Sequence, residues 1–207
     1  MTDLVTGADG LRRCRWGAST PEYEQYHDDE WGRPVVDDAR LYEKVCLEGF
    51  QSGLAWITIL RKRDAFRRAF KGFDPSKVAR FGEKDVDRLL GDAAIVRHRG
   101  KIEATIANAK ATLRVQGELG SLAALVWSFE PKRRRVPTSY GDVPPSTPES
   151  TAMSKELLRR GFRFVGPTTC YAAMQALGVV NDHLRGCHVR QACEAERGAI
   201  DRATIGG

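Results

Sequence analysis

Two pairs of metal-binding side chains lie near opposite ends of the chain, and they restrict its fold more than any other feature. His183 and Cys187 stand four residues apart in NDHLRGC, a spacing that places both on one face of a helix. Cys14 and His27 lie near the start, outside any obvious long helix. Together they form a Cys2His2 set, the kind that closes a tetrahedral zinc site with no open position. If all four bind one ion, the N-terminal segment must pack against the C-terminal part of the chain.

Neighbouring residues compete for the same role. His188 and Cys193 lie close to the second pair, although His188 at i+5 points away from the face that His183 and Cys187 would share. The cysteines number five and are irregularly spaced, which argues against a disulfide framework and leaves metal binding or plain burial. Spacing alone leaves both a four-ligand site and ordinary core residues open.

The rest of the sequence predicts an all-α fold. Helix-period patterns recur and β-branched runs are few, and Asp74 followed by Pro75 is a typical N-cap and first helical residue. The stretch 131–148 is rich in proline and charge, so we expect it to be irregular. Its basic cluster at 132–135 is more typical of a solvated loop than of a phosphate site. The expected helices lie within 38–49, 54–70, 84–90, 101–113, 122–129 and 154–162.

Composition limits the cellular compartments and the binding partners that we expect for this protein. Hydrophobic residues make up 42% of the chain, and no apolar stretch approaches the ~18 residues of a membrane span. The N-terminus lacks the apolar centre of a secretory signal, so we expect a cytoplasmic protein without a membrane partner. A net charge of +6 favours polyanionic partners, among them nucleic acid.

Five segments together resemble the bacterial 3-methyladenine DNA glycosylase I family: CRW…YHDDEWG, CLEGFQSGLAWITIL, IVRHRGKI, GFRFVGPTTCYAAMQALGVVNDH and HLRGC. The resemblance runs from about residue 13 to residue 187. It implies a helix-hairpin-helix glycosylase fold, a single domain over 1–207, and a bacterial cytosolic enzyme that acts as a monomer on double-stranded DNA carrying alkylated bases. It also implies one structural zinc ion on Cys14, His27, His183 and Cys187, the same four residues that the spacing suggested.

A basic turn between two helical patterns is the candidate DNA-binding hairpin. Backbone N–H groups at a helix start bind phosphate, and basic side chains would add charge at the same place. Judged from its residues alone, this stretch is equally well an ordinary turn between two helices. The resemblance implies that it is the hairpin that anchors one DNA strand without reading its sequence. The residues concerned are Arg97, His98, Arg99, Gly100 and Lys101.

The candidate base pocket combines aromatic residues with one carboxylate. Tyr23, Tyr26, Trp31 and Trp56 cluster in sequence, and by themselves they suit a core as well as a base-binding cage. Glu48 lies on an otherwise apolar helix stripe, where a carboxylate must find a partner or stay open to solvent. A flipped base is read in such a pocket by stacking and by hydrogen bonds to its edge.

The resemblance predicts a reaction that needs little acid catalysis. N3-alkylation makes adenine a cation and a good leaving group, so an aromatic face and Glu48 would favour it over the neutral base. The helix after Gly100 contains no aspartate, and no lysine is placed persuasively as a Schiff-base nucleophile, so we expect a monofunctional hydrolase. Activity on 3-methylguanine stays open. The alternatives are a zinc-stabilised DNA-binding module without activity and, more weakly, a hydrolase that uses Cys46 or Cys170.

Overall fold

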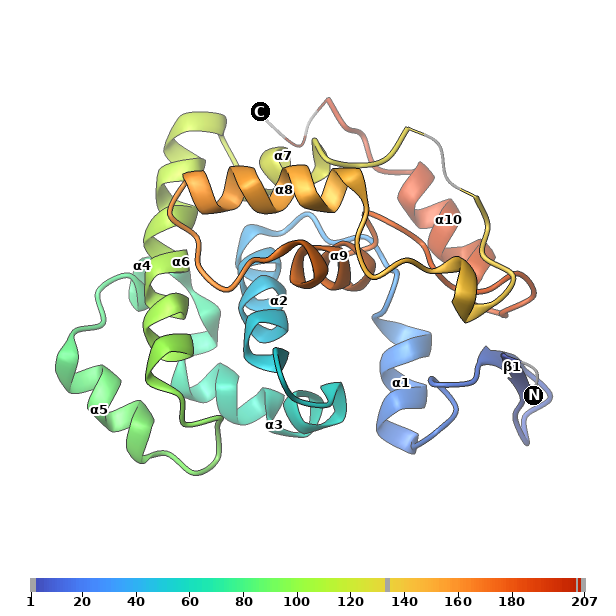
Figure 1. The fold of residues 1–207 in the computed structure, drawn as a ribbon, viewed down its shortest axis with the longest axis horizontal. Helices are drawn as coiled ribbons and strands as arrows, with labels where there is room; N and C mark the ends of the chain where they lie inside the picture. Colours follow the sequence, from blue (N-terminus) through green and yellow to red (C-terminus); the bar gives the residue numbers. More distant parts are fainter. Residues whose placement is uncertain (1–2, 133–134, 204, 206–207) are drawn as a thin grey trace.

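The computed structural model describes residues 3–132, 135–203 and 205, and the described chain is mostly helical, as the sequence predicted (Figure 1). Arg133 and Arg134 of the basic cluster lie outside the described residues. The helices in the described ranges are α1 (Pro21–Asp29), α2 (Asp38–Gln51), α3 (Trp56–Ala69), α4 (Pro75–Val78), α5 (Glu83–Gly91), α6 (Arg99–Leu119), α7 (Leu122–Trp127), α8 (Pro148–Arg159), α9 (Pro167–Ala176) and α10 (Arg190–Gly198), with short 3-10 turns at Lys71–Phe73 and Tyr140–Asp142.

A small β-hairpin near the N-terminus departs from the all-α prediction. Strand β1 (Leu4–Thr6) pairs antiparallel with β2 (Arg12–Cys14), and Leu4 lies opposite Cys14. Three residues a strand are too few for a periodic pattern, which is why the sequence did not indicate them. The hairpin delivers Cys14, fully buried, to the end of β2.

Local signals explain where several helices begin. The Asp74 side chain accepts a hydrogen bond from the Ser76 N–H and caps α4, as predicted. Thr20 caps α1 in the same way, with Pro21 in its first turn. Helix α3 begins at Trp56, two residues later than expected. The nine-residue α1 was missed because its sequence is polar and short.

Helix α2 lies in the middle of the fold and contacts α3, α6, α7 and α9 (Figure 1). All ten residues of 41–50 are buried. Phenylalanines on α2 and α3 pack closely, with the Phe50 and Phe66 ring centroids 4.6 Å apart. Because α2 is enclosed on several sides, its polar residues Glu43, Lys44 and Glu48 are carried into the interior, where each must be paired or serve a purpose.

The chain ends meet in a second, smaller buried cluster. Cys14 packs there with residues from the segment that follows α9 and from α10. The described part of 131–148 is irregular, as predicted, apart from the turn at Tyr140–Asp142 and Pro148, the first residue of α8. Within the described ranges, no helix has the length and apolar character that crossing a membrane requires.

Candidate metal centre and adjoining cleft

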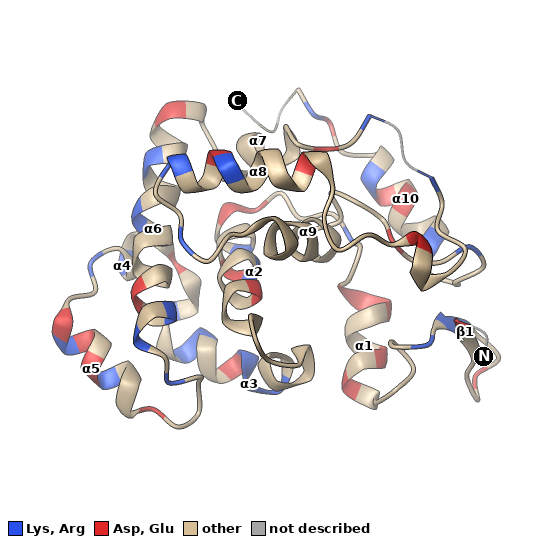
Figure 2. Ribbon diagram, viewed as in Figure 1, with Lys and Arg blue, Asp and Glu red and all other residues tan. Residues whose placement is uncertain are grey.

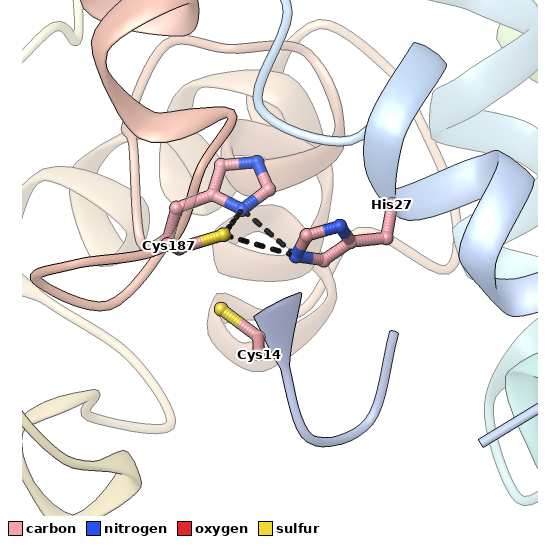
Figure 3. A group of neighbouring side chains, drawn as sticks. Cys14, His27 and Cys187 are labelled. Atoms are coloured by element: carbon pink, nitrogen blue, oxygen red, sulfur yellow. Dashed lines mark hydrogen bonds between the residues drawn. The ribbon is translucent and has the colours of Figure 1, made fainter. Parts of the chain in front are cut away.

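The two predicted ligand pairs come together in one buried group. One ligand atom from each of Cys14, His27, His183 and Cys187 lies within 4.8 Å of all the others. Cys14, His27 and Cys187 point toward one another from three separate segments (Figure 3). His27 Nε2 lies 3.2 Å from His183 Nδ1 and 3.4 Å from the Cys187 sulfur, which is 3.6 Å from His183 Nδ1. A tetrahedral zinc site with ordinary bond lengths separates its N and S ligands by about 3.3–3.8 Å, so the geometry fits such an ion.

The outer nitrogens of both imidazoles fix which nitrogens face the centre. His27 Nδ1 lies 2.7 Å from a carboxylate oxygen of Asp28, and His183 Nε2 lies 2.9 Å from the Trp31 carbonyl oxygen. Both outer nitrogens must therefore carry the proton, and in neutral rings the two inner nitrogens present lone pairs to each other. A cation between them relieves this repulsion, and metal-binding histidines commonly have such outer partners.

The two sulfurs hold their protons differently. The hydrogen bond with Cys187 and burial raise the pKa of the Cys14 thiol. Cys187 accepts that hydrogen bond, which is the largest cause that holds the pKa of its own thiol below the usual value. The Leu184 N–H points at the Cys14 sulfur from 3.4 Å. Burial lowers the pKa of His183, which favours the neutral ring. Thiolate and neutral imidazole are the forms that bind metal.

The prediction that His183 and Cys187 share a helix face is wrong. Helix α9 ends at Ala176, and residues 181–187 form a loop with a turn. Gly186 adopts φ +90°, a conformation that glycine tolerates, and the Cys187 N–H donates to the Leu184 carbonyl. The turn brings the two side chains together by a different route from the i,i+4 spacing of a helix.

Asp28 organises the outside of the centre. Its carboxylate contacts His27, His188 at 3.1 Å, and the buried guanidinium of Arg13 at 2.8 Å. Burial works against the ionised form, but the bonds from Arg13, His27 and His188 hold the Asp28 pKa below its ordinary value. His188, the rival ligand, is thus engaged with Asp28, and the other rival, Cys193, lies buried in the same small cluster.

A cleft of about 290 Å³ lies beside the metal centre. It contains the predicted Tyr23, Tyr26, Glu48 and Trp56. Five further residues line the cleft that the sequence did not predict there: Trp16, Trp31, Gln51, Ala172 and Gln175. Helices α1, α2 and α9 and the start of α3 each contribute to its walls. Only the fold joins these segments, so spacing in the sequence offered no signal for the additional residues.

The aromatic wall of the cleft packs directly on the metal-binding histidines. The rings of Trp31 and His183 are 4.6 Å apart, and those of Trp16 and His27 are 5.3 Å apart. On the opposite side, the Tyr26 and Trp56 ring centroids lie 5.4 Å apart. The metal centre therefore supports one wall of the cleft through these ring contacts.

Glu48 and Trp56, which both line the cleft, each carry a polar group without a partner among the described residues. Glu48 is 6% exposed, and its carboxylate forms no hydrogen bond or ion pair with any residue that the structure describes. Burial raises its pKa to about 8, while the charge of Lys44 acts in the opposite direction. The Trp56 indole N–H is buried and, within the described ranges, has no acceptor. A carboxylate left without a partner at the wall of a cleft suits a polar ligand.

The basic turn lies between α5 and α6, where Arg97, His98 and Arg99 are exposed. The His98 ring caps α6, because its Nδ1 accepts the Lys101 N–H at 3.2 Å. Arg99 is paired with Glu83 at 2.6 Å and Asp87 at 3.0 Å. Basic and acidic residues alternate along α5 and the start of α6 (Figure 2).

One expectation for this turn is wrong. Lys101 is 7% exposed, and its amino group donates to the carbonyls of Phe50 at 2.8 Å and Ser52 at 2.6 Å. The Lys101 amino group thus supplies hydrogen bonds to carbonyls at the C-terminal end of α2, which lack helical partners. Its charge therefore lies away from solvent. Of the basic side chains in the turn, Arg97 is the one most available to a phosphate.

The two cysteines considered as nucleophiles are buried. Burial raises the pKa of both Cys46 and Cys170 to about 12, which keeps them as thiols. Neither is among the residues that surround the described cleft. These positions argue against a cysteine hydrolase.

The chain is similar to several known proteins. The chain is 50% identical over 179 residues to DNA-3-methyladenine glycosylase 1 of Escherichia coli, covering 86% of this chain and 96% of that protein. It is 46% identical to DNA-3-methyladenine glycosylase of Haemophilus influenzae, covering 84% and 96%. A crystal structure of 3-methyladenine DNA glycosylase I superposes with a TM-score of 0.82, at 49% identity over 85% of this chain and 98% of that one. The Staphylococcus aureus enzyme, studied for 3-methyladenine recognition, also gives 0.82, at 34% identity over 86% and 96%.

The helical fold, the cleft and these likenesses define the chain as a DNA glycosylase. It belongs to the methyladenine glycosylase family, whose model matches residues 16–191.

Proposed function

We propose that the protein releases 3-methyladenine from alkylated double-stranded DNA by hydrolysis. The observation that carries the proposal is the aromatic cleft with one buried carboxylate, Glu48, that lacks a partner among the described residues. A base inside a duplex cannot reach such a cleft, so it must first be flipped out of the stack. The relatives named for this activity support the same substrate.

The residues of the cleft suit a cationic base. The faces of Tyr26 and Trp56 offer π-density, which attracts a cation more than a neutral ring. Glu48 accepts hydrogen bonds from the base edge and supplies the opposite charge. Because the alkylated base leaves readily, water can attack C1′ through an oxocarbenium-like transition state without a strong acid.

The reaction ends at the abasic sugar, without a lyase step. A Schiff-base mechanism needs an amine at the cleft, and no lysine is among the residues that surround the described cleft. Lys101, the nearest candidate on α6, has its amino group committed to two carbonyls. We infer that one domain over 1–207 acts as a monomer in the bacterial cytosol, with the exposed Arg97 and the backbone at the start of α6 binding phosphate.

We assign one structural zinc ion to Cys14, His27, His183 and Cys187. The donor set, the separations and the facing lone pairs support zinc. When bound, the ion would hold the N-terminal hairpin and α1 against the segment after α9. It takes no part in the chemistry.

The test is to incubate the protein with methylated duplex DNA and measure the free bases released. Release of 3-methyladenine, leaving abasic sites in unbroken strands, is the expected result, and the same assay measures 3-methylguanine. Tight DNA binding with no base released would instead support the alternative of a zinc-stabilised binding module. Strand breakage at the abasic site would refute the monofunctional assignment.

A further inference from the structure

A layer of charged residues lies directly beneath the cleft. Lys44 precedes Glu48 by one turn of α2, so their side chains lie on the same face with Cβ atoms about 5–6 Å apart. Lys44 is 9% exposed. Burying an ammonium group is costly unless it interacts with opposite charge, so its position next to Glu48 needs an explanation.

Other charged groups hold Lys44 in place. Glu30, which follows α1, forms short contacts with Arg63 of α3, at 2.6 and 2.7 Å, and a longer one with the Lys44 amino group at 3.8 Å. The same amino group lies 5.6 Å from the centroid of the Tyr26 ring. Arg40, one turn earlier on α2, is partly exposed and pairs with Glu43. The charge of Lys44 acts on Glu30 and on Glu48 alike, and Lys44 is the charged neighbour that lowers the pKa of Glu48.

We propose that Lys44 is a positioning residue that sets the ionisation of Glu48, and thereby the preference of the cleft for a cationic base. This rests on the proposed function. Glu30 acts one step further out, because its charge favours the protonated form of Lys44, and Arg63 holds Glu30 in place. Lys44 is not among the residues that surround the described cleft, so it acts through Glu48.

The electrostatic directions agree with this geometry. Burial lowers the pKa of Lys44 to about 8, against the attraction of Glu30 and Glu48. Burial raises the pKa of Glu48 to about 8, and Lys44 pulls it back down. Without Lys44 the carboxyl would hold its proton more tightly, because an opposite charge at ~4–6 Å shifts a carboxyl pKa by about 1–3 units.

Binding a cation then becomes coupled to the loss of one proton. In the empty cleft near neutral pH, Glu48 keeps its proton. A cationic base favours the carboxylate, so the proton passes from Glu48 to solvent while Lys44 keeps its own charge. A neutral base supplies no such drive. The contribution of Lys44 is to place this exchange near neutral pH.

The direct test is a carbon-13 NMR titration of the Glu48 carboxyl in the whole protein, without substrate. Lys44→Met removes the charge and keeps the chain length, and should raise the Glu48 midpoint by about one to two pH units. Arg40→Met removes a positive charge one turn further along the same helix and should leave the midpoint nearly unchanged. Lys44→Arg restores the charge and should bring the midpoint back toward the parental value.

The activity test uses 3-methyladenine release from methylated duplex DNA across a pH series. The acidic limb of kcat/KM reports groups of the free enzyme. In Lys44→Met this limb should move up with the carboxyl midpoint, which lowers kcat/KM about ten- to hundredfold at pH 7, with recovery at higher pH. In the Glu48→Gln background, Lys44→Met should change little, because two residues that act through one another are not additive.

Equal Glu48 midpoints in the parent and in Lys44→Met would overturn the proposal, and so would a loss of activity that is the same at every pH. If Lys44→Met fails to fold, Lys44→Gln offers a second test. It also removes the charge, keeps a polar group in its place, and should raise the Glu48 midpoint in the same direction. A parent protein that releases no 3-methyladenine would refute the proposed function, while the NMR titration would still decide the link between Lys44 and Glu48.

Discussion

Glu48→Gln is expected to stabilise the folded protein at neutral pH while it impairs base release. Burial raises the pKa of Glu48 from 4.5 to about 8. Below about pH 4.5 the carboxyl is protonated in the folded and unfolded states alike, and folding is not penalised. As the pH rises from there to about 8, the unfolded state loses its proton first, so this carboxyl reduces the free energy of unfolding steadily.

The size of the effect follows from the shift. One pKa unit corresponds to about 1.4 kcal/mol. At pH 7 the pH lies about 2.5 units above the unfolded pKa and still below the folded one, so the cost is about 3 kcal/mol. With the side chain only 6% exposed, solvent screening reduces this little. A neutral glutamine does not incur this pH-dependent cost.

The assay is urea unfolding of the metal-loaded parent and variant at pH 5, 6, 7 and 8. Groups common to both proteins cancel in the difference, apart from Lys44, whose pKa Glu48 raises. The two free energies should be similar at pH 5, and the variant should be more stable by about 3 kcal/mol at pH 7. Release of 3-methyladenine should fall about ten- to hundredfold, the loss expected when a polar contact worth about 1–3 kcal/mol is removed.

Glu43→Gln is the matched control on the same helix. Glu43 is as deeply buried, but it pairs with Arg67 at 2.7 Å and Arg40 at 3.1 Å. Losing this charge leaves two guanidinium groups without it, so the control should be less stable than the parent. A difference between Glu48→Gln and the parent that is constant from pH 5 to 8 would refute the reasoning, because Glu48 would then be ionised in the folded state throughout.

The remaining predictions concern the metal, the DNA surface and the cleft wall. Elemental analysis should find one zinc ion per chain, and Cys14→Ser or His183→Ala should lose it with a lower Tm; protein without stoichiometric zinc would contradict the assignment. Removing the metal with a chelator should weaken the binding of free 3-methyladenine, measured by calorimetry, because Trp31 packs on His183; unchanged binding would mean that the wall stands without the ion. Arg97→Ala should weaken binding to all duplexes alike and reduce the slope of log K against log salt by about one, whereas an unchanged slope would place Arg97 away from phosphate. Trp56→Ala should lower base binding and leave affinity for undamaged DNA near the parental value.

The sequence by itself determined the helical class, most helix positions and the four candidate ligands. These features are local or depend on residue chemistry. Periodicity and capping residues such as Asp74 report on a few neighbouring positions, and cysteine and histidine are strong metal ligands wherever they occur. The short α1 and the three-residue strands gave too little periodic signal to be recognised.

Only the tertiary structure decided how the side chains are used. The i,i+4 spacing of His183 and Cys187 suggested a helix, but a glycine turn brings them together, because the metal set requires proximity and not a particular secondary structure. Lys101 has the sequence context of a phosphate ligand, yet packing of α6 on α2 turns its amino group toward two carbonyls. Nothing in the sequence distinguishes Lys44 from an exposed helix residue, and it is the packing around α2 that buries it beside Glu48. The burial and the pairing of a side chain depend on contacts between segments that are distant in sequence. These contacts determine which charges are available to a ligand.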